Sequence, residues 1–341
     1  PLRLHALLAR MVRNGATRAV MEVSSHALVH RRTEHVPFRA GVLTNVTEDH
    51  LDFHGDMESY RRAKQILFEN LSTESVAVLN ADSPVCERYS EATPATVFTY
   101  GVDALADIKM EQSRSSVGGT NMVVRTPTES YLLRTPLVGR YNCENVLAAA
   151  TVAFVLGISG DVVREAMRHF PGVGGRLEKI QPEPGAGLPT VFVDYAHTPN
   201  ALGKVLSTLK PLTRGQLICV FGCGGDRDRH KRPLMGKIAT EIADLSVITA
   251  DNSRSEKTGD ILKEILEGVE RQEAHYVTEP DRRKAIERAV QAASSSDDVV
   301  AVCGRGCERH QILGDRRIPF DDRMVVREIL EQSRRNKKRT A

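Results

Sequence analysis

Hydrophobic and polar residues follow a regular order in the second half of the chain. Short apolar runs predict buried strands at 190–195, 216–222, 245–250, 274–279 and 298–304. Apolar residues at helical spacing predict helices after the first four of these strands, at 200–210, 232–243, 258–270 and 282–293. A hairpin-like stretch at 311–320 and one last helix follow. Because strands and helices alternate strictly, we predict an α/β fold with a mostly parallel sheet and right-handed crossovers.

The first half of the chain mixes its elements. The pattern predicts short strands at 18–23, 39–46 and 75–80, helices at 2–12 and 57–71, and alternating strands within 108–138. Two more helices are predicted at 142–157 and 160–170, and "PGVGGR" at 171–176 has the composition of a hinge. We therefore predict two domains, 1–173 and 174–341, which a length of 341 residues allows.

Charge and cysteine content narrow the choice of partners. The 47 Lys and Arg against 44 Asp and Glu leave a formal charge of +3, which favours neither nucleic acid nor a membrane as a partner. No apolar stretch approaches the length of a membrane span. The six cysteines are scattered without a CxxC pair, so we interpret them as reduced thiols in a cytoplasmic protein. The chain begins with Pro1 and a helix-like stretch, and we expect it to be a piece of something longer.

Polar residues gather where the predicted strands of the second half end. Asp194, "GCGGDRD" (222–228), "DNSR" (251–254) and "GRGCE" (304–308) each follow a strand. Because ligands of such sheets lie beyond the carboxyl ends of the strands, these four exits predict a ligand site. "DNSR" alone is also typical of a solvated turn, whereas an acid, an amide and a guanidinium together suit a free amino acid.

The glycines of "GCGGDRD" suggest a phosphate loop, but the stretch does not fit GxxxxGK[ST]. That pattern occurs nowhere in the chain. If the protein uses ATP, the loop that holds the phosphates must therefore lie outside these 341 residues.

A second polar cluster lies in the first half. "MEVSSH" contains Glu22, Ser24 and Ser25, and "TNVTEDHLDFHGD" contains Asn45, Asp49, His50, Asp52, His54 and Asp56. Carboxylates with imidazole suit a divalent ion such as Mg²⁺, but the same residue types are typical of helix N-terminal caps. Lys64 lies in the predicted helix that follows, where a lysine is usually solvated.

Together these stretches resemble the Mur ligase family. The matching motifs occur in the family's order: "MEVSSHAL", "TNVTEDHLDFHGDMESYRRAK", "GRYNCENVLAAA", "GRLE", "VDYAHTP", "FGCGGDRDRHKRPLMG", "DNSRSE" and "GRGCE" with "FDDR". The resemblance implies the remainder of a P-loop-type central domain that lacks its P-loop, followed by a Rossmann-like C-terminal domain with a mostly parallel sheet. The missing first domain of the family binds a uridine nucleotide.

The likeness is strongest to family members that add meso-diaminopimelate. It implies an ATP-dependent amide ligase of peptidoglycan synthesis that works with Mg²⁺ in the cytoplasm as a monomer. ATP would phosphorylate the D-glutamyl carboxylate of the UDP-muramoyl-dipeptide, and an amine of diaminopimelate would then attack the acyl phosphate. Neither nucleic acid nor a membrane is implied as a partner.

The resemblance also assigns roles to residues of this sequence. Glu22 and His50 would hold Mg²⁺, and Lys64 matches a lysine that the family carbamylates, so that it ligates a second Mg²⁺; Lys64 and His50 would be catalytic. Positions at the muramoyl-dipeptide are Ser24, His30 and Arg32, although relatives carry Gln where His30 stands. Positions at ATP are Asn142, Asn145, Arg176 and Asp194.

The implied diaminopimelate clamp consists of Arg227, Asp251, Asn252, Ser253, Arg254, Gly304 and Glu308. A guanidinium can bind a carboxylate through two hydrogen bonds, so Arg254 favours diaminopimelate over lysine, which has no distal carboxylate. Ser253 replaces a proline of the family, which predicts a looser turn, and Cys307 replaces a histidine. Two alternatives stay open. The first is a sibling ligase: one that adds lysine, another Mur ligase or a folylpolyglutamate synthetase. The second is an inactive fragment that only binds amino acid.

Overall fold

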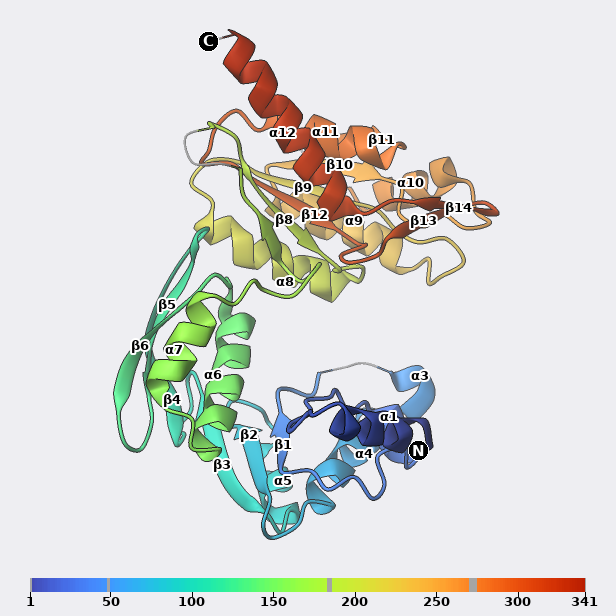
Figure 1. The fold of residues 1–341 in the computed structure, drawn as a ribbon. Helices are drawn as coiled ribbons and strands as arrows, with labels where there is room; N and C mark the ends of the chain where they lie inside the picture. Colours follow the sequence, from blue (N-terminus) through green and yellow to red (C-terminus); the bar gives the residue numbers. More distant parts are fainter. Residues whose placement is uncertain (1, 48–49, 183–185, 270–274, 341) are drawn as a thin grey trace. The chain divides into compact units, whose positions relative to one another are not determined.

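The computed structural model describes residues 2–47, 50–182, 186–269 and 275–340 (Figure 1). The chain forms two compact units, each described here by itself. Unit 1 comprises Pro1–Arg114, Asn121–Thr135 and Arg140–His169, and unit 2 comprises Ser115–Thr120, Pro136–Gly139 and Phe170–Ala341. The domain boundary predicted from the sequence, between residues 173 and 174, stays a prediction.

Unit 2 contains the parallel sheet that the sequence predicts. Its strands are β7 (Glu178–Ile180), β8 (Thr190–Asp194), β9 (Leu217–Phe221), β10 (Leu245–Thr249), β11 (Tyr276–Glu279) and β12 (Val299–Cys303). They lie in the order β11-β10-β9-β12-β8-β7, and every neighbouring pair is parallel except β7 with β8. The carboxyl ends of β8, β9, β10 and β12 therefore meet at one edge of the sheet.

Helices connect these strands and cover the sheet. They are α8 (Pro199–Leu209), α9 (Lys231–Ile242), α10 (Thr258–Leu266), α11 (Arg282–Ala292) and α12 (Asp322–Thr340), with a 3-10 turn η1 (Lys210–Leu212) after α8. Thr198 caps α8 and Asp281 caps α11, because each side chain accepts a hydrogen bond from a backbone amide of the first turn. The predicted hairpin is present as β13 (His310–Leu313) and β14 (Arg316–Pro319).

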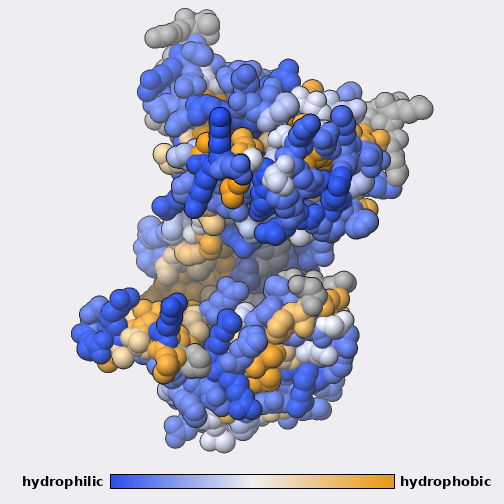
Figure 2. All heavy atoms as spheres, turned by 90° about the vertical axis from the view of Figure 1, so that its right-hand side faces the viewer, coloured by the Kyte–Doolittle hydropathy of each residue, from blue (hydrophilic) through white to orange (hydrophobic). Residues whose placement is uncertain are grey.

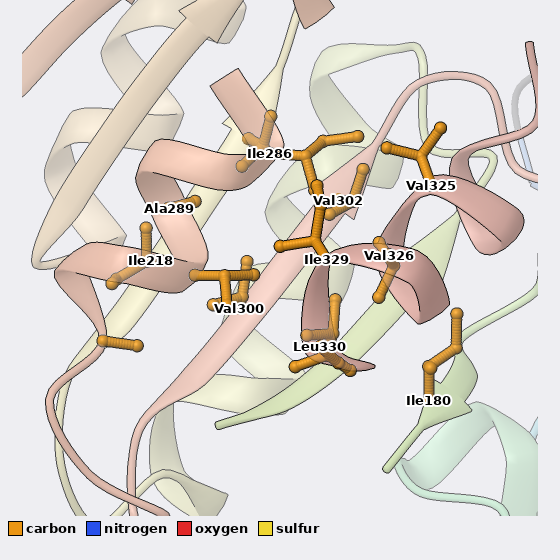
Figure 3. Packing of buried hydrophobic residues seen from close by; sticks show 14 of the residues in the cluster. Ile180, Ile218, Ile286, Ala289, Val300, Val302, Val325, Val326, Ile329 and Leu330 are labelled. Atoms are coloured by element: carbon orange, nitrogen blue, oxygen red, sulfur yellow. The ribbon is translucent and has the colours of Figure 1, made fainter. Parts of the chain in front are cut away.

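One hydrophobic core cluster of unit 2 lies between the sheet and helices α11 and α12 (Figure 3). Val300 and Val302 of β12 are fully buried, and they pack with Ile286 of α11 and Val326 and Ile329 of α12. Every residue of β8, β9 and β12 is buried. Burial on both faces explains why these strands are continuous apolar runs in the sequence.

Unit 1 contains a second six-stranded sheet. Its strands, in sheet order as well as chain order, are β1 (Ala40–Leu43), β2 (Val76–Asn80), β3 (Thr96–Gly101), β4 (Ile108–Ser116), β5 (Gly119–Arg125) and β6 (Ser130–Thr135). The first four strands pair in parallel. The helices are α1 (Leu2–Arg13), α2 (Ser25–Val29), α3 (Leu51–His54), α4 (Met57–Glu69), α5 (Cys86–Ala92), α6 (Arg140–Val155) and α7 (Gly160–Arg168).

One predicted strand is wrong. Residues 16–24 have no regular secondary structure, and Val20, which the prediction placed in a buried strand at 18–23, is fully exposed. None of the described strands pairs with this segment. A strand is stable only when a neighbour completes its hydrogen bonds and covers one face, so an apolar run alone did not suffice.

The surface of the described chain is mainly polar. Figure 2 shows one face on which hydrophilic residues dominate and hydrophobic residues form scattered patches. No helix within the described residues combines the length and the apolar character that a membrane crossing requires.

Candidate functional site

Two of the predicted strand exits pack directly against each other in unit 2. Gly225 donates its backbone N–H to the carbonyl of Asn252 at 2.9 Å. A Cβ on Gly225 would lie 1.9 Å from the Ser253 carbonyl oxygen, and one on Gly222 would lie 2.1 Å from that of Thr249. The glycines of "GCGGDRD" therefore allow the backbones of two loops to touch, which is a physical reason for them other than a phosphate loop.

Asp251 brings a carboxylate to this edge of the sheet. The residue is 7% exposed, and its Oδ1 accepts from the Asn252 backbone N–H at 2.5 Å. Its Oδ2 is buried and has no hydrogen-bond partner within the described residues. A Cβ on residue 304 would lie 2.6 Å from this Oδ2, so Gly304, at φ +116°, lets the backbone of the β12 exit lie close against the carboxylate. An acceptor without a donor in a polar site suits a ligand that carries an N–H.

Asn252 and Glu308 form a second polar pair next to Asp251. The Asn252 side chain is buried, and its Nδ2 donates to Oε2 of Glu308 at 2.8 Å. Glu308 is partly exposed, with 34% of its side chain accessible. The pair thus joins the exits of β10 and β12 and presents an amide and a carboxylate side by side.

Arg254 and Arg227 border the same glycine. A Cβ on Gly224 would lie 2.9 Å from Nη1 of Arg254 and 3.8 Å from Cγ of Arg227. Nη1 of Arg254 donates to the Gly225 carbonyl at 2.7 Å. Arg227 is exposed. The side chains of Arg254 and Arg227 therefore both lie beside Gly224, and their joint role in a clamp stays a prediction.

The β13–β14 hairpin holds the backbone of Arg254. Arg254 donates its N–H to the Ile312 carbonyl at 3.1 Å and accepts from the Gly314 N–H at 2.7 Å. Gln311, which is 3% exposed, donates from Nε2 to the carbonyl of Asp251 at 2.9 Å. Arg254 lies at φ +49°, an uncommon conformation for a residue with a side chain, and these bonds offset its strain.

Ser253 differs from the expectation of a loose turn. It is 2% exposed, and its hydroxyl lies 2.7 Å from Oγ1 of Thr258, the first residue of α10. The serine thus loses the fixed φ of a proline but gains a hydrogen bond to the next helix. The turn is anchored by that bond and by the hairpin.

Two buried ionic groups beneath the site were not predicted from the sequence. Arg282 and Asp322 have fully buried side chains and form two hydrogen bonds, at 2.8 and 2.7 Å. Arg282 also donates to the carbonyls of Ala250 at 3.2 Å and Cys303 at 3.0 Å, which are the residues just before Asp251 and Gly304. Asp322 raises the pKa of Arg282, which burial alone lowers. The pair ties α11 and α12 to the ends of β10 and β12.

The pattern of polar and apolar residues does not mark these groups, because "RRK" at 282–284 and "FDDR" at 320–323 are typical of solvated helix starts. The "FDDR" motif of the resemblance was the one available signal for Asp322. Arg305, in the "GRGCE" stretch, is also fully buried and was not predicted as a site residue.

A charged network supports the "GCGGDRD" loop from below. Arg232 is fully buried, bonds both oxygens of Glu256 at 2.8 and 2.9 Å, and donates to Glu264 at 2.7 Å. It also donates to the Gly224 carbonyl at 3.2 Å. The hydrogen bond from Arg232 is the main reason why the pKa of Glu256 is lowered to about 2.

Asp194 and Arg176, both predicted at ATP, lie at the exit of β8. Each oxygen of Asp194 already accepts a backbone N–H, from Leu177 at 2.7 Å and from Ala196 at 2.8 Å. Burial raises the pKa of Asp194, and these two bonds oppose that effect. The guanidinium of Arg176 lies 5.1 Å from the centre of the Tyr195 ring, and the side chain is exposed. Asp194 therefore fixes the loop that presents Arg176.

In unit 1, histidines and aromatic rings surround the predicted catalytic residues. The ring of His50 lies 6.4 Å from that of Tyr60, and Nζ of Lys64 lies 5.1 Å from the centre of the same ring. His26 lies 4.8 Å from His50. Ser25 is buried and hydrogen-bonds to Nε2 of His54 at 2.9 Å. The structure thus brings His50 and Lys64 to Tyr60, which the sequence did not single out.

The described residues do not complete a magnesium site. No group of three or more His, Cys, Asp or Glu within them is arranged to hold a metal ion. Glu22 is exposed in the segment without regular secondary structure. Asp49, which the sequence pattern included, lies outside the described residues. The assignment of Glu22, His50 and Lys64 to Mg²⁺ stays a prediction.

The other predicted residues of unit 1 lie at helix ends. Ser24 caps α2, since its Oγ accepts from the Ala27 N–H at 3.1 Å. His30 ends the same helix 5.7 Å from the Phe53 ring, and Arg32 is exposed just beyond it. The three residues predicted at the muramoyl-dipeptide are therefore grouped around α2.

Asn142 and Asn145 lie in the first turns of α6. A hollow of about 640 Å³ opens at this end of the helix, and its lining includes Arg140 and Glu144 of α6 together with Asn80, the last residue of β2, and Asp82 just after it. Arg140 pairs with Asp103 at 2.6 Å on the same rim. The two asparagines themselves are not part of the lining.

Comparison with known proteins identifies relatives of the whole chain. Residues 1–153 match the Mur ligase middle domain, and residues 175–306 match the Mur ligase glutamate ligase domain. The chain is 45% identical over 333 residues to the UDP-N-acetylmuramoyl-L-alanyl-D-glutamate–2,6-diaminopimelate ligase of Gloeobacter violaceus, covering 98% of this chain and 67% of that protein. The ligase of the same name from Bacillus cereus is 40% identical, and the match covers 96% of this chain and 67% of that protein.

Solved structures agree with these relatives. A UDP-N-acetylmuramoyl-L-alanyl-D-glutamate–2,6-diaminopimelate ligase superimposes with a TM-score of 0.73 and 33% identity, over 97% of this chain and 68% of that one. A folylpolyglutamate synthase of Mycobacterium tuberculosis superimposes with a TM-score of 0.60 at 24% identity, over 78% and 61%, which indicates a shared fold alone. The chain spans about two thirds of the length of the curated relatives it matches.

Proposed function

The chain belongs to the Mur ligase family, and from this membership we propose that it forms part of an ATP-dependent ligase that adds meso-diaminopimelate to UDP-N-acetylmuramoyl-L-alanyl-D-glutamate. The reaction belongs to peptidoglycan synthesis in the cytoplasm. Residues 174–341 would bind the incoming amino acid, and residues 1–173 would contribute to the site of the nucleotide substrates. The six free cysteines agree with a cytoplasmic setting.

One observation carries the amino-acid part of the proposal. Arg254 and Arg227 border Gly224, while the unpartnered Oδ2 of Asp251 and the carboxylate of Glu308 lie on the adjoining strand exits. Guanidinium groups bind carboxylates, and carboxylates bind ammonium groups, so the edge offers both kinds of contact. The distal end of meso-diaminopimelate carries one carboxylate and one ammonium, which matches this pair of charges.

The proposed reaction takes place in two steps. The γ-phosphate of ATP is transferred to the D-glutamyl carboxylate, which yields an acyl phosphate and ADP. The amine at the proximal end of diaminopimelate then attacks the acyl carbon, and inorganic phosphate leaves as the amide forms and the amine loses a proton. Binding the distal end would leave the proximal amine free to be aimed at the acyl phosphate.

The roles of the other predicted residues belong to the proposal as well. Asn142, Asn145, Arg176 and Asp194 would serve ATP; Ser24, His30 and Arg32 would serve the muramoyl-dipeptide. Lys64 and His50 would act near the phosphoryl group, supported by their shared position beside Tyr60. Asp194 would act mainly through the loop it holds, because both of its oxygens already accept backbone N–H groups.

Sibling activities are the alternatives. A ligase that adds lysine would have no carboxylate for Arg254, and an unpaired guanidinium within the site would be costly. Formation of the amide product distinguishes a diaminopimelate-adding ligase from its siblings. The full-length protein is incubated with ATP, Mg²⁺ and UDP-N-acetylmuramoyl-L-alanyl-D-glutamate. Radiolabelled meso-diaminopimelate, lysine or glutamate is added in separate reactions. We expect labelled amide product with diaminopimelate alone. Product with lysine or glutamate at a similar rate contradicts the proposal.

A further inference from the structure

Arg305 is a fully buried arginine in the "GRGCE" stretch, between Gly304 and Glu308 in the sequence. Its Nη1 donates to Oδ1 of Asn252 at 2.8 Å. Its Nη2 donates to the carbonyls of His310 at 2.7 Å and Phe320 at 3.3 Å. The guanidinium also lies 3.6 Å from Oε2 of Glu308. Arg305 therefore touches two of the side chains that face the proposed amino-acid site.

The contacts of Arg305 determine which way the Asn252 amide points. Oδ1 of Asn252 accepts two hydrogen bonds, from Arg305 and from the Ile312 backbone N–H at 2.9 Å. An amide NH₂ in that place would meet two donors and could accept neither, so only one orientation satisfies the network. The opposite orientation of Asn252 is thereby excluded, and Nδ2 is turned toward Glu308.

This orientation has a chemical consequence for a ligand. Nδ2 has two hydrogens, and Glu308 takes one of them through Oε2. The second N–H of Asn252 and Oε1 of Glu308 form no hydrogen bond with another described residue, so this pair keeps one donor and one acceptor for a ligand. An amino-acid centre, with a carboxylate and an ammonium on one carbon, offers the complementary acceptor and donor.

Burial of the charged Arg305 side chain is unfavourable for the free energy of folding. Its Nε has no hydrogen-bond partner in the described part of the chain, and the nearest carboxylate oxygen to it, Oδ1 of Asp322, is 3.9 Å away. Burial lowers the pKa of Arg305, and the neighbouring charge of Arg282 lowers it further. A buried charge with incomplete partners destabilises a fold, and this favours a role beyond packing.

Arg282 provides an internal comparison. Its side chain is as buried as that of Arg305 and lies beneath the same strand exits, but within the described residues its hydrogen bonds go to Asp322 and to backbone carbonyls. Loss of Arg282 would disturb the scaffold generally. Loss of Arg305 would in addition release the Asn252 amide.

We propose that Arg305 is a positioning residue that sets the selectivity of the site for an amino-acid centre at the distal end of the substrate. It acts by fixing the Asn252 amide and, through it, the Glu308 carboxylate. The inference rests on the proposed function, because it assumes that the distal end of diaminopimelate binds at this edge. A substrate without a distal carboxylate, such as lysine, gains nothing from the oriented N–H of Asn252.

The test compares the affinities of meso-diaminopimelate and L-lysine by calorimetric titration of the 341-residue chain. Arg305→Lys keeps a positive charge but cannot reach Asn252 and the two carbonyls together. We expect it to lower the affinity ratio of diaminopimelate to lysine by at least about fivefold. The matched control Arg282→Lys should lower the melting temperature while the affinity ratio stays within about twofold of wild type. An unchanged ratio in Arg305→Lys overturns the proposal.

A second variant covers the case in which Arg305→Lys does not fold. In Asn252→Asp, the carboxylate still accepts from Arg305 and Ile312, but the hydrogen bond to Glu308 is replaced by a contact between two carboxylates, so the melting temperature should fall moderately at neutral pH while the chain still folds. Its other oxygen replaces Nδ2 and cannot donate, and diaminopimelate affinity should fall at least about tenfold. Wild-type affinity in this variant overturns the proposal, because the oriented N–H is then unused. A wild-type chain that binds neither amino acid contradicts the proposed function itself and this inference with it.

Discussion

The positive charge of Arg254 is the main feature that would bind the distal carboxylate of the amino acid. Its backbone is held at φ +49° by the hairpin, and its Nη1 is held by the Gly225 carbonyl, so the guanidinium is fixed before a ligand arrives. We expect Arg254→Ala to weaken binding of meso-diaminopimelate by about 1.5–3 kcal/mol, the usual scale of a hydrogen bond to a charged group. Titration calorimetry on the variant measures this directly.

The control for this prediction is Arg335→Ala. Arg335 lies on α12 with 67% of its side chain exposed and pairs with Glu331. Its loss removes the same charge from the chain but should leave the affinity unchanged. Equal effects of the two substitutions would show that only net charge matters and that Arg254 makes no specific contact.

At the residue scale, the sequence predicted the polar residues at the strand exits and missed the buried charges beneath them. Asp251, Asn252 and Arg254 follow an apolar strand, and that change of polarity is visible in one sequence. Arg282 and Asp322 are 40 positions apart, and each looks like an ordinary charge at a helix start. Only the fold shows that they are buried together, because burial depends on which elements pack and not on local pattern.

The contact between two strand-exit loops is the feature that matters at the element scale. A Cβ at Gly225 would collide with the Ser253 carbonyl at 1.9 Å and push the "DNSR" turn away from its place. We expect Gly225→Ala to lower both the melting temperature and the affinity for meso-diaminopimelate. Gly259→Ala, in α10, is the matched control, since no atom lies within 4 Å of its new Cβ. A helix position of that kind should become slightly more stable with alanine.

The Arg232 network links α9 to α10, and its strength should depend on pH. The pKa of Glu256 falls from an ordinary 4.5 to about 2 in the folded chain. A carboxyl group with a lowered pKa stabilises the fold fully above its unfolded value, and this contribution is lost as the pH falls toward the folded value. The window therefore lies between about pH 4.5 and pH 2.

Glu256→Gln tests that link by calorimetric melting across pH. We expect the variant to melt below wild type at neutral pH, with a difference that stays constant down to about pH 5 and shrinks between pH 4.5 and 2. A difference that is the same at every pH would mean that Glu256 acts through packing and not through its charge.

The sequence pattern predicted the strands that are buried on both faces, and it was less successful for elements that are only partly buried. The strands of unit 2 are apolar on both faces, so their sequence pattern is strong. The predicted strand at 18–23 has similar residues, but no described strand pairs with it. Strand β3 and helix α5 were missed, because "TVFTYG" and "CERYSEA" are short and show weak periodicity.

For the whole molecule, we expect amino-acid binding and ATP hydrolysis to be separable. The chain has no GxxxxGK[ST] motif and spans about two thirds of its curated relatives, so we expect these 341 residues to bind amino acid without hydrolysing ATP. Release of phosphate from ATP by the purified chain measures this. Turnover that survives both His50→Ala and Lys64→Ala would show that the phosphoryl site has been assigned to the wrong residues.

The central claim is that the strand exits of unit 2 bind an amino acid through its distal carboxylate. The most direct measurement is calorimetric titration of the wild-type chain with meso-diaminopimelate and, separately, with L-lysine, which lacks only that carboxylate. The account predicts saturable binding of diaminopimelate and an affinity for lysine lower by at least about tenfold. Equal affinities, or no binding of diaminopimelate, would contradict it.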